Sequence, residues 1–532
     1  MLGGELVFHF LNVIVMTALV APLVLWRYRR AVLAGMQDRL GAPLPVAAPR
    51  ARAERAPGPG ASTVAAKLAW ETALRRRIFG VALVAAFVPS LLLALQKYLL
   101  DAEPFTPLQV FLSAAVTTMA AVPICALLTA MPRWRAVMLA MWTLCGLAAT
   151  TVVLSILQRL VSGRAPTLDQ AFNFVLFFEA AALTLWLPTL LGLAIGARRV
   201  RGVAPLAFAA LLVFAVAPLF GVRVTQWLAG MRWSAGWVLS GPGIDAGFVV
   251  LALPIGVLAW WRLRALARAY EAKRFSDAQL LAHSWWLLLV AVDALTLISV
   301  HPGTRTLLQV VGVSVVAYAL LPFLLGRGLR WAQRDAPAPA PRTLLLLRVF
   351  GDTARTAALF DRIATRWQRF GPVTMIAAPD VVAGTVDPGD ILRFATGNLA
   401  AGFVTSQDDL TRRLATMDVA PDGDGRYRIN EFCCHDDTWQ ATVVELIERA
   451  DAVVMDLRGF TAQRHGCEFE LKELGARLNP SRVVLVVDAS TDRALLTQLA
   501  PAGGANMRTV EIARGNGRQV DAAFLALLEA AA

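Results

Sequence analysis

The chain has 532 residues, of which 57% are hydrophobic and only 17% are charged. A soluble protein of this size does not need so much apolar sequence, so the composition predicts membrane-spanning helices. Residues 1–341 carry 30 Lys and Arg against 13 Asp and Glu, or +17, whereas residues 342–532 carry 21 against 25, or −4. The excess positive charge behind the net +13 therefore belongs to the apolar part. There it orients membrane spans, and it does not mark a nucleic-acid-binding surface. The five cysteines form no regular pattern, which argues against a disulfide framework.

Nine apolar segments are long enough, or nearly so, to cross a bilayer. They cover residues 6–26, 78–100, 108–130, 136–157, 171–195, 203–222, 246–261, 283–300 and 304–325. The connections between them alternate in basic charge, and the first, residues 27–77, holds 11 Lys and Arg. By the positive-inside rule this alternation predicts an N-terminus outside the cell and a cytoplasmic C-terminus. We therefore expect residues 1–333 to form a polytopic α-helical domain in the lipid bilayer.

Two carboxylic acids fall inside these spans, Glu179 in the fifth and Asp293 in the eighth. An intramembrane charge is costly, so such residues indicate either a proton or ion path or a hydrogen-bonded carboxyl between helices.

Two other segments predict little regular structure. Residues 41–66 are rich in Ala, Pro, Gly and Arg, which is typical of a disordered cytoplasmic loop. Residues 334–342, RDAPAPAPR, predict an extended Pro-Ala linker that separates the membrane part from a domain at 343–532.

Strands and helices alternate in this C-terminal domain. Apolar runs predict five core strands at 343–350, 373–378, 452–457, 482–488 and 507–513. Helices are expected from Asp352 to Phe370, from Asp436 or Asp437 to Arg449, from about His465, and at 491–500 and 518–531. Residues 380–432 are irregular, with two short helices and a strand at 426–432. The alternation predicts a doubly wound, flavodoxin-like parallel sheet, which binds ligands at the carboxyl ends of its strands.

A carboxylate, Glu470, lies at that edge. In the helix after the third core strand, the apolar stripe is formed by Cys467, Leu471, Leu474 and Leu478. Glu470 lies about 60° from this stripe, in the first helical turn. It is therefore either a solvated flank, pairing with Lys472 or Arg464, or a group directed into a cleft.

The stretches LLRVFGDTARTAALFDRI and GFTAQRHGCEFEL resemble a TIR domain, in which the third strand leads to a helix that begins with Cys-x-x-Glu-Leu. More closely, the ordered motifs LRVF, FGPV, DDTWQ and CEFEL resemble the tail of a set of multi-span bacterial membrane proteins. The match covers about 190 residues, the whole predicted soluble domain. The resemblance implies a multi-pass protein of the bacterial inner membrane that acts in signalling or defence.

In TIR enzymes that cleave NAD, the Glu of this motif is the catalytic carboxylate, so the resemblance points to Glu470, with NAD as substrate and no cofactor. A carboxylate suits this chemistry, because cleavage of a nicotinamide–ribose bond passes through an oxocarbenium-like state. The same group also suits nucleotide binding without turnover. TIR-like domains further imply homo-oligomeric assembly. An insertion at 380–432 and the pair His465–Gly466, where the motif has Trp, depart from the family pattern.

Further residues are candidates for nucleotide contacts. Asp352 and Thr353 open the first helix, where backbone N–H groups favour a phosphate, although both also suit a simple helix cap. Arg348 precedes this turn and Phe460 follows the third core strand.

A zinc site is an alternative for the cysteine and histidine residues near this edge. Its ligands would come from Cys433, Cys434, His435, His465 and Cys467. Adjacent cysteines bind one metal poorly and no Cys-x-x-Cys is present, so small buried thiols are the simpler interpretation.

Three functions thus remain open: a membrane-anchored nucleotide-binding protein that hydrolyses NAD, a non-catalytic assembly module on a membrane sensor, and a transporter with a regulatory domain. Glu470 distinguishes the first function from the second, because an assembly module does not need it. Glu179 and Asp293 distinguish the third, because a sensor or anchor does not need them.

Overall fold

The computed structural model describes residues 25–38, 41–49, 63–101, 107–129, 272–334, 339–348, 353–377, 399–499, 507–513 and 517–531, apart from single positions, and isolated residues elsewhere. These belong to two compact units: Met1–Pro22 with Arg75–Ala332, and Leu23–Leu74 with Gln333–Ala532.

The described part of the first unit is helical. It contains α3 (Pro107–Met119), α4 (Val122–Thr129), α12 (Asp277–Val300), nearly all of α13 (Thr304–Arg334), and α2 (Val64–Asp101) from Arg75 onward. Among the described residues, two helices, Val64–Leu100 and Arg305–Arg334, are long and apolar enough to cross a membrane. They contain the predicted spans 78–100 and 304–325.

The other predicted spans are described less completely. The predicted span 108–130 is divided between α3 and α4, and 283–300 lies in α12, which packs against α4. The remaining predicted spans lie wholly or mostly outside the described residues.

The second unit contains a parallel sheet of seven strands. They are β1 (Leu344–Arg348), β2 (Val373–Ile376), β3 (Phe403–Val404), β4 (Ile429–Cys434), β5 (Ala452–Asp456), β6 (Val483–Val487) and β7 (Arg508–Glu511). Their order is β3-β4-β2-β1-β5-β6-β7, and every pair is parallel. Five consecutive strands, β2-β1-β5-β6-β7, follow the 2-1-3-4-5 order of flavodoxin-like sheets. This confirms the predicted parallel sheet and all five predicted core strands.

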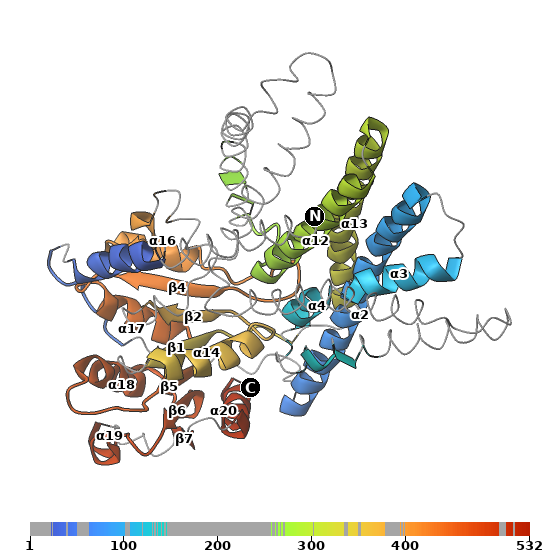
Figure 1. Cartoon of the computed structure of the whole chain (residues 1–532). Helices are drawn as coiled ribbons and strands as arrows, with labels where there is room; N and C mark the ends of the chain where they lie inside the picture. Colours follow the sequence, from blue (N-terminus) through green and yellow to red (C-terminus); the bar gives the residue numbers. More distant parts are fainter. Residues whose placement is uncertain are drawn as a thin grey trace. The chain divides into compact units, whose positions relative to one another are not determined.

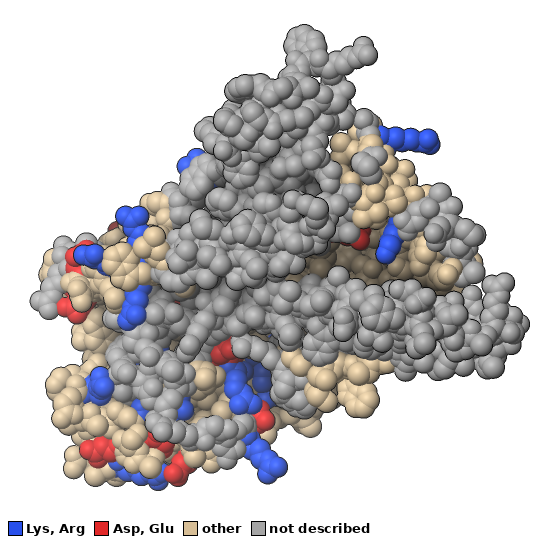
Figure 2. Space-filling view, viewed as in Figure 1, with Lys and Arg blue, Asp and Glu red and all other residues tan. Residues whose placement is uncertain are grey.

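Helices cover both faces of the sheet (Figure 1). Helices α14 (Thr353–Trp367) and α20 (Gly517–Ala530) bury Trp367 and Phe524 against one face, together with the start of α2. Helices α16 (Gln407–Ala415), α17 (Trp439–Arg449), α18 (His465–Arg477) and α19 (Arg493–Leu499) pack on the other. Each face of the sheet thus has its own buried apolar cluster beneath a layer of helices, as in a doubly wound domain. Figure 2 shows Lys and Arg interspersed with Asp and Glu on the described surface of this domain.

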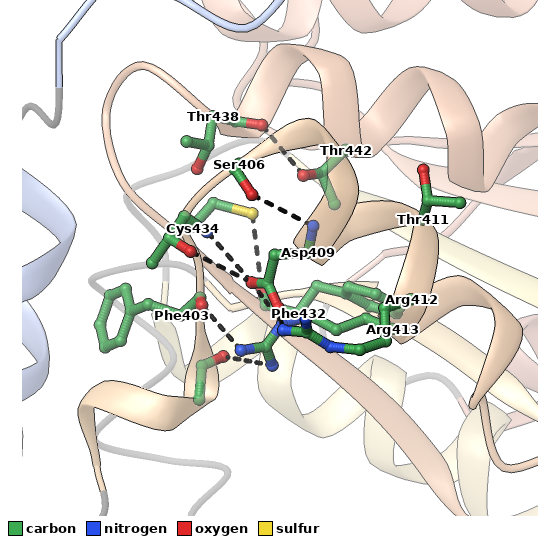
Figure 3. Close-up of polar contacts among 12 residues, drawn as sticks. Phe403, Ser406, Asp409, Thr411, Arg412, Arg413, Phe432, Cys434, Thr438 and Thr442 are labelled. Atoms are coloured by element: carbon green, nitrogen blue, oxygen red, sulfur yellow. Dashed lines mark hydrogen bonds and ion pairs between the residues drawn. The ribbon is translucent and has the colours of Figure 1, made fainter.

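The described residues of the segment 380–432 contain two short helices, as the sequence predicted, and one strand, β3, that it did not predict. Helix α16 is one of the two, and the strand expected at 426–432 lies at Ile429–Cys434. Asp409 holds this edge together (Figure 3): it accepts hydrogen bonds from Arg413 and from the Thr405 N–H. Arg413 also donates to the carbonyl oxygens of Phe403 (2.8 Å) and Gly402 (3.2 Å). This side chain therefore connects α16 to the edge strand.

Both predicted unstructured segments are partly described. Arg342, at the end of the linker, accepts a hydrogen bond from the Trp367 indole and pairs with Asp451 at 3.6 Å, so it belongs to the folded domain. Residues 41–49 are extended chain held by hydrogen bonds to the domain. Residues 64–66 begin α2. The expected disorder of residues 41–66 therefore includes neither its first part nor its last three residues.

Candidate ligand site at the carboxyl edge of the sheet

The sheet has a topological switch point between β1 and β5. Strand β1 is followed along the chain by β2 on one side, whereas β5 leads to β6 on the other. In open α/β sheets ligands bind at such a point, outside the carboxyl ends of the strands. The last residues of the two strands, Arg348 and Asp456, are register partners. A guanidinium and a carboxylate therefore lie next to each other where the two strands end, at the candidate site.

Glu470 is buried at this edge. It is 4% exposed, and its Oε2 has no hydrogen-bond partner within the described part of the chain. Burial raises the pKa of Glu470 to about 8, although the nearby charge of Arg348 acts to lower it. The solvated-flank interpretation of Glu470 is thus wrong, and the carboxyl group is directed inward.

Helix α18 is positioned by its core-facing stripe. Cys467, Leu471 and Leu474 are each at most 2% exposed and belong to the core beneath the helix. The Cys467 Sγ lies 3.6 Å from the backbone oxygen of Arg348 and fixes the first turn against the end of β1. Because Glu470 follows Cys467 by three residues, one helical turn brings it to the same edge.

An ion pair that the sequence analysis did not identify completes this edge. Arg458 donates to Asp456 through Nη2 at 2.7 Å and through Nε at 2.8 Å. Asp456 is 1% exposed, whereas Arg458 is half-buried. The signal was present as an Asp that ends an apolar strand, followed two residues later by Arg. The pair places a second guanidinium next to the switch point.

The described part of the structure does not place the other candidates for nucleotide contacts at this site. Phe460 is fully buried in the core, where its backbone N–H bonds to Leu457 and its carbonyl to Asp492. It therefore supports the loop and does not present a stacking surface. Thr353 begins α14, but its side chain and Asp352 lie outside the described residues.

The candidate zinc ligands do not converge. His465 is exposed and faces Glu468, at 3.8 Å, while His435 stacks on Phe403. Cys434 is buried, and burial raises the pKa of its thiol to about 11. Among the described residues no group of three metal-ligating side chains comes together.

Of the two carboxyl groups that the sequence predicts to lie in the membrane, only Asp293 is described. It lies on α12, and its Oδ2 is buried without a hydrogen-bond partner among the described residues. Glu179 lies outside the described part, so the structure does not relate the two groups.

Comparisons with protein-family models, curated protein sequences and solved structures found no match to this chain. The functional argument therefore rests on the geometry of the switch point.

Proposed function

We propose that this chain is a membrane-anchored signalling or defence protein whose C-terminal domain binds a nucleotide at Arg348 and Glu470 and hydrolyses NAD there. One observation carries the proposal: a buried carboxyl group with an unused oxygen lies beside a buried guanidinium at the switch point of a flavodoxin-like sheet. A buried polar atom without a partner is costly, and sites that bind ligands are where proteins tolerate such a cost.

The two side chains suit the two ends of a nucleotide. The Arg348 guanidinium can neutralise a phosphate, with Arg458 as a second cation beside it. Glu470 can accept hydrogen bonds from ribose hydroxyl groups. When ionised, it can also stabilise the positive charge that develops on the ribose as the bond to nicotinamide breaks.

The membrane anchor is supported by composition and by the two apolar helices. Residues 23–74, which include most of the connection between the first and second predicted spans, form one compact unit with residues 333–532. This association supports a topology in which the basic first connection and the nucleotide-binding domain share the cytoplasmic side of a multi-pass protein.

Nicotinamide release from NAD by the full chain in detergent micelles tests the catalytic part of the proposal. Glu470→Gln keeps the size of the side chain and removes its charge, so we expect release to fall by about 100-fold or more. Glu468→Gln is the matched control, because Glu468 lies on the same helix and pairs with His465 instead of facing the site. Release that is equal in the two variants would contradict a role for Glu470.

A further inference from the structure

Residues 41–49, GAPLPVAAP, lie as an extended segment on the α/β domain. We name this segment the strap. It follows the first predicted membrane span in the chain and precedes α2. Its contacts link it to residues almost 400 or more positions later in the sequence.

The strap contacts the domain at every third residue. The Gly41 N–H donates to Oδ2 of Asp437 at 2.9 Å, and the Leu44 N–H donates to the Asp437 carbonyl oxygen at 3.0 Å. The Ala47 carbonyl oxygen accepts from Arg477. Leu44 and Ala47 are half-buried, whereas the other strap residues are exposed.

This period of three is that of a polyproline II helix, which has three residues per turn and no internal hydrogen bonds. The sequence favours such a conformation, because Pro43 and Pro45 have restricted φ and also disfavour the helical region for the residue before each of them. An extended segment of this kind loses little conformational entropy when it docks.

The surface beneath the strap is built by α17 and α18. Asp437 immediately precedes Thr438, the N-cap of α17, and Arg477 ends α18. Arg477 is held in place by Glu473 of its own helix and by Glu448 of α17. Between these polar ends, Leu44 packs against the same apolar core as two aromatic rings, Trp439 and Phe469, whose centroids are 5.4 Å apart.

We propose that the α17–α18 surface is a binding site for a proline-rich extended peptide, and that residues 41–49 of this chain occupy it. Asp437 and Arg477 form hydrogen bonds with the backbone of the peptide, and the apolar surface between them packs against one aliphatic side chain. The strap thereby ties the α/β domain to the chain that leaves the first predicted span. The proposal does not depend on nucleotide binding or hydrolysis.

Hydrogen exchange of the full chain in detergent micelles, followed on peptides that cover the strap, tests the proposal. In the wild-type protein we expect the Gly41 and Leu44 amides to exchange at least about tenfold more slowly than an unstructured chain. Leu44→Asp should remove this protection, because a charge replaces the side chain that packs on the core. Val46→Asp is the matched control, since Val46 is 39% exposed two residues further along the same segment.

A second arm separates loss of docking from general unfolding. The amides of β1 and β5 should stay protected in both variants. A synthetic peptide of residues 38–49 should then bind the Leu44→Asp chain more tightly than the wild-type chain, whose site is occupied. Unprotected strap amides in the wild-type protein, equal exchange in the two variants, or equal peptide binding by both chains would each overturn the proposal.

Discussion

The protonation of Glu470 is coupled to the stability of the domain. Its pKa is raised from the ordinary 4.5 to about 8, mainly by burial, so the folded state holds this proton more tightly than the unfolded state does. The stabilisation that this provides is complete below pH 4.5 and is lost as the pH rises through 8. Above that pH the fold contains a buried carboxylate at a cost of roughly 5 kcal/mol at most.

Glu470→Gln should therefore change the melting temperature in a pH-dependent way. The neutral amide has no charge to bury, so the variant should gain stability relative to the wild-type protein as the pH rises from 5 to 9. Thermal unfolding of both proteins across this range measures the difference. A difference that is constant with pH would show that Glu470 does not titrate between its ordinary value and 8.

The same titration predicts the pH dependence of catalysis. If the ionised form of Glu470 stabilises the oxocarbenium-like state, kcat/KM for NAD should rise about tenfold per pH unit below 8 and level off above it. Initial rates of nicotinamide release between pH 5.5 and 9 measure this profile. A rate that falls as the pH approaches 8 would instead indicate that the protonated carboxyl acts as an acid.

Sequence periodicity was informative for Glu470, whereas Phe460 was a candidate only because it follows the third core strand. The position of Glu470 on α18 follows from the apolar stripe, which the sequence shows directly. Phe460 follows Gly459, whose φ of 76° turns the chain, and the ring points into the core. A local reversal of this kind depends on backbone conformation, which hydrophobic patterning does not report.

At the scale of elements, the edge formed by β3 and α16 depends on Arg413. It bonds to Asp409 and to the carbonyl oxygens of Gly402 and Phe403. Among the contacts described, the Arg412 side chain bonds only to Asp409, and it is 71% exposed. Arg413→Ala should cost about 1–3 kcal/mol and speed amide exchange in β3 and α16. Arg412→Ala should cost less than about 1 kcal/mol. Chemical denaturation followed by hydrogen exchange compares them, and equal effects would contradict this role of Arg413.

The elements also show where sequence-based prediction succeeds. The core strands β1, β5 and β6 are runs of five residues buried on both faces, so each forms an uninterrupted apolar segment. Strand β3 has only two residues, and β4 has a mixed burial pattern near the edge of the sheet. Pairing between neighbours defines these two strands, so their boundaries could not be read from local composition.

At the scale of the whole molecule, the account requires a membrane-integral chain with a cytoplasmic C-terminal domain. The protein should remain with the membrane fraction after alkaline extraction. Protease should digest the C-terminal domain in inside-out membrane vesicles and leave it intact in right-side-out vesicles. Digestion in the opposite orientation, or release of the protein at alkaline pH, would contradict the predicted topology.

The central claim is that a nucleotide binds at Arg348 and Glu470. Equilibrium binding of NAD to the full chain in detergent micelles tests it most directly, with Arg348→Gln, Glu470→Gln and Glu468→Gln measured in parallel and the fold of each variant checked by thermal unfolding. We predict saturable binding by the wild-type protein that weakens about tenfold or more in the first two variants and is unchanged in the third. Absence of binding, or binding that is equally tight in all four proteins, would contradict the account.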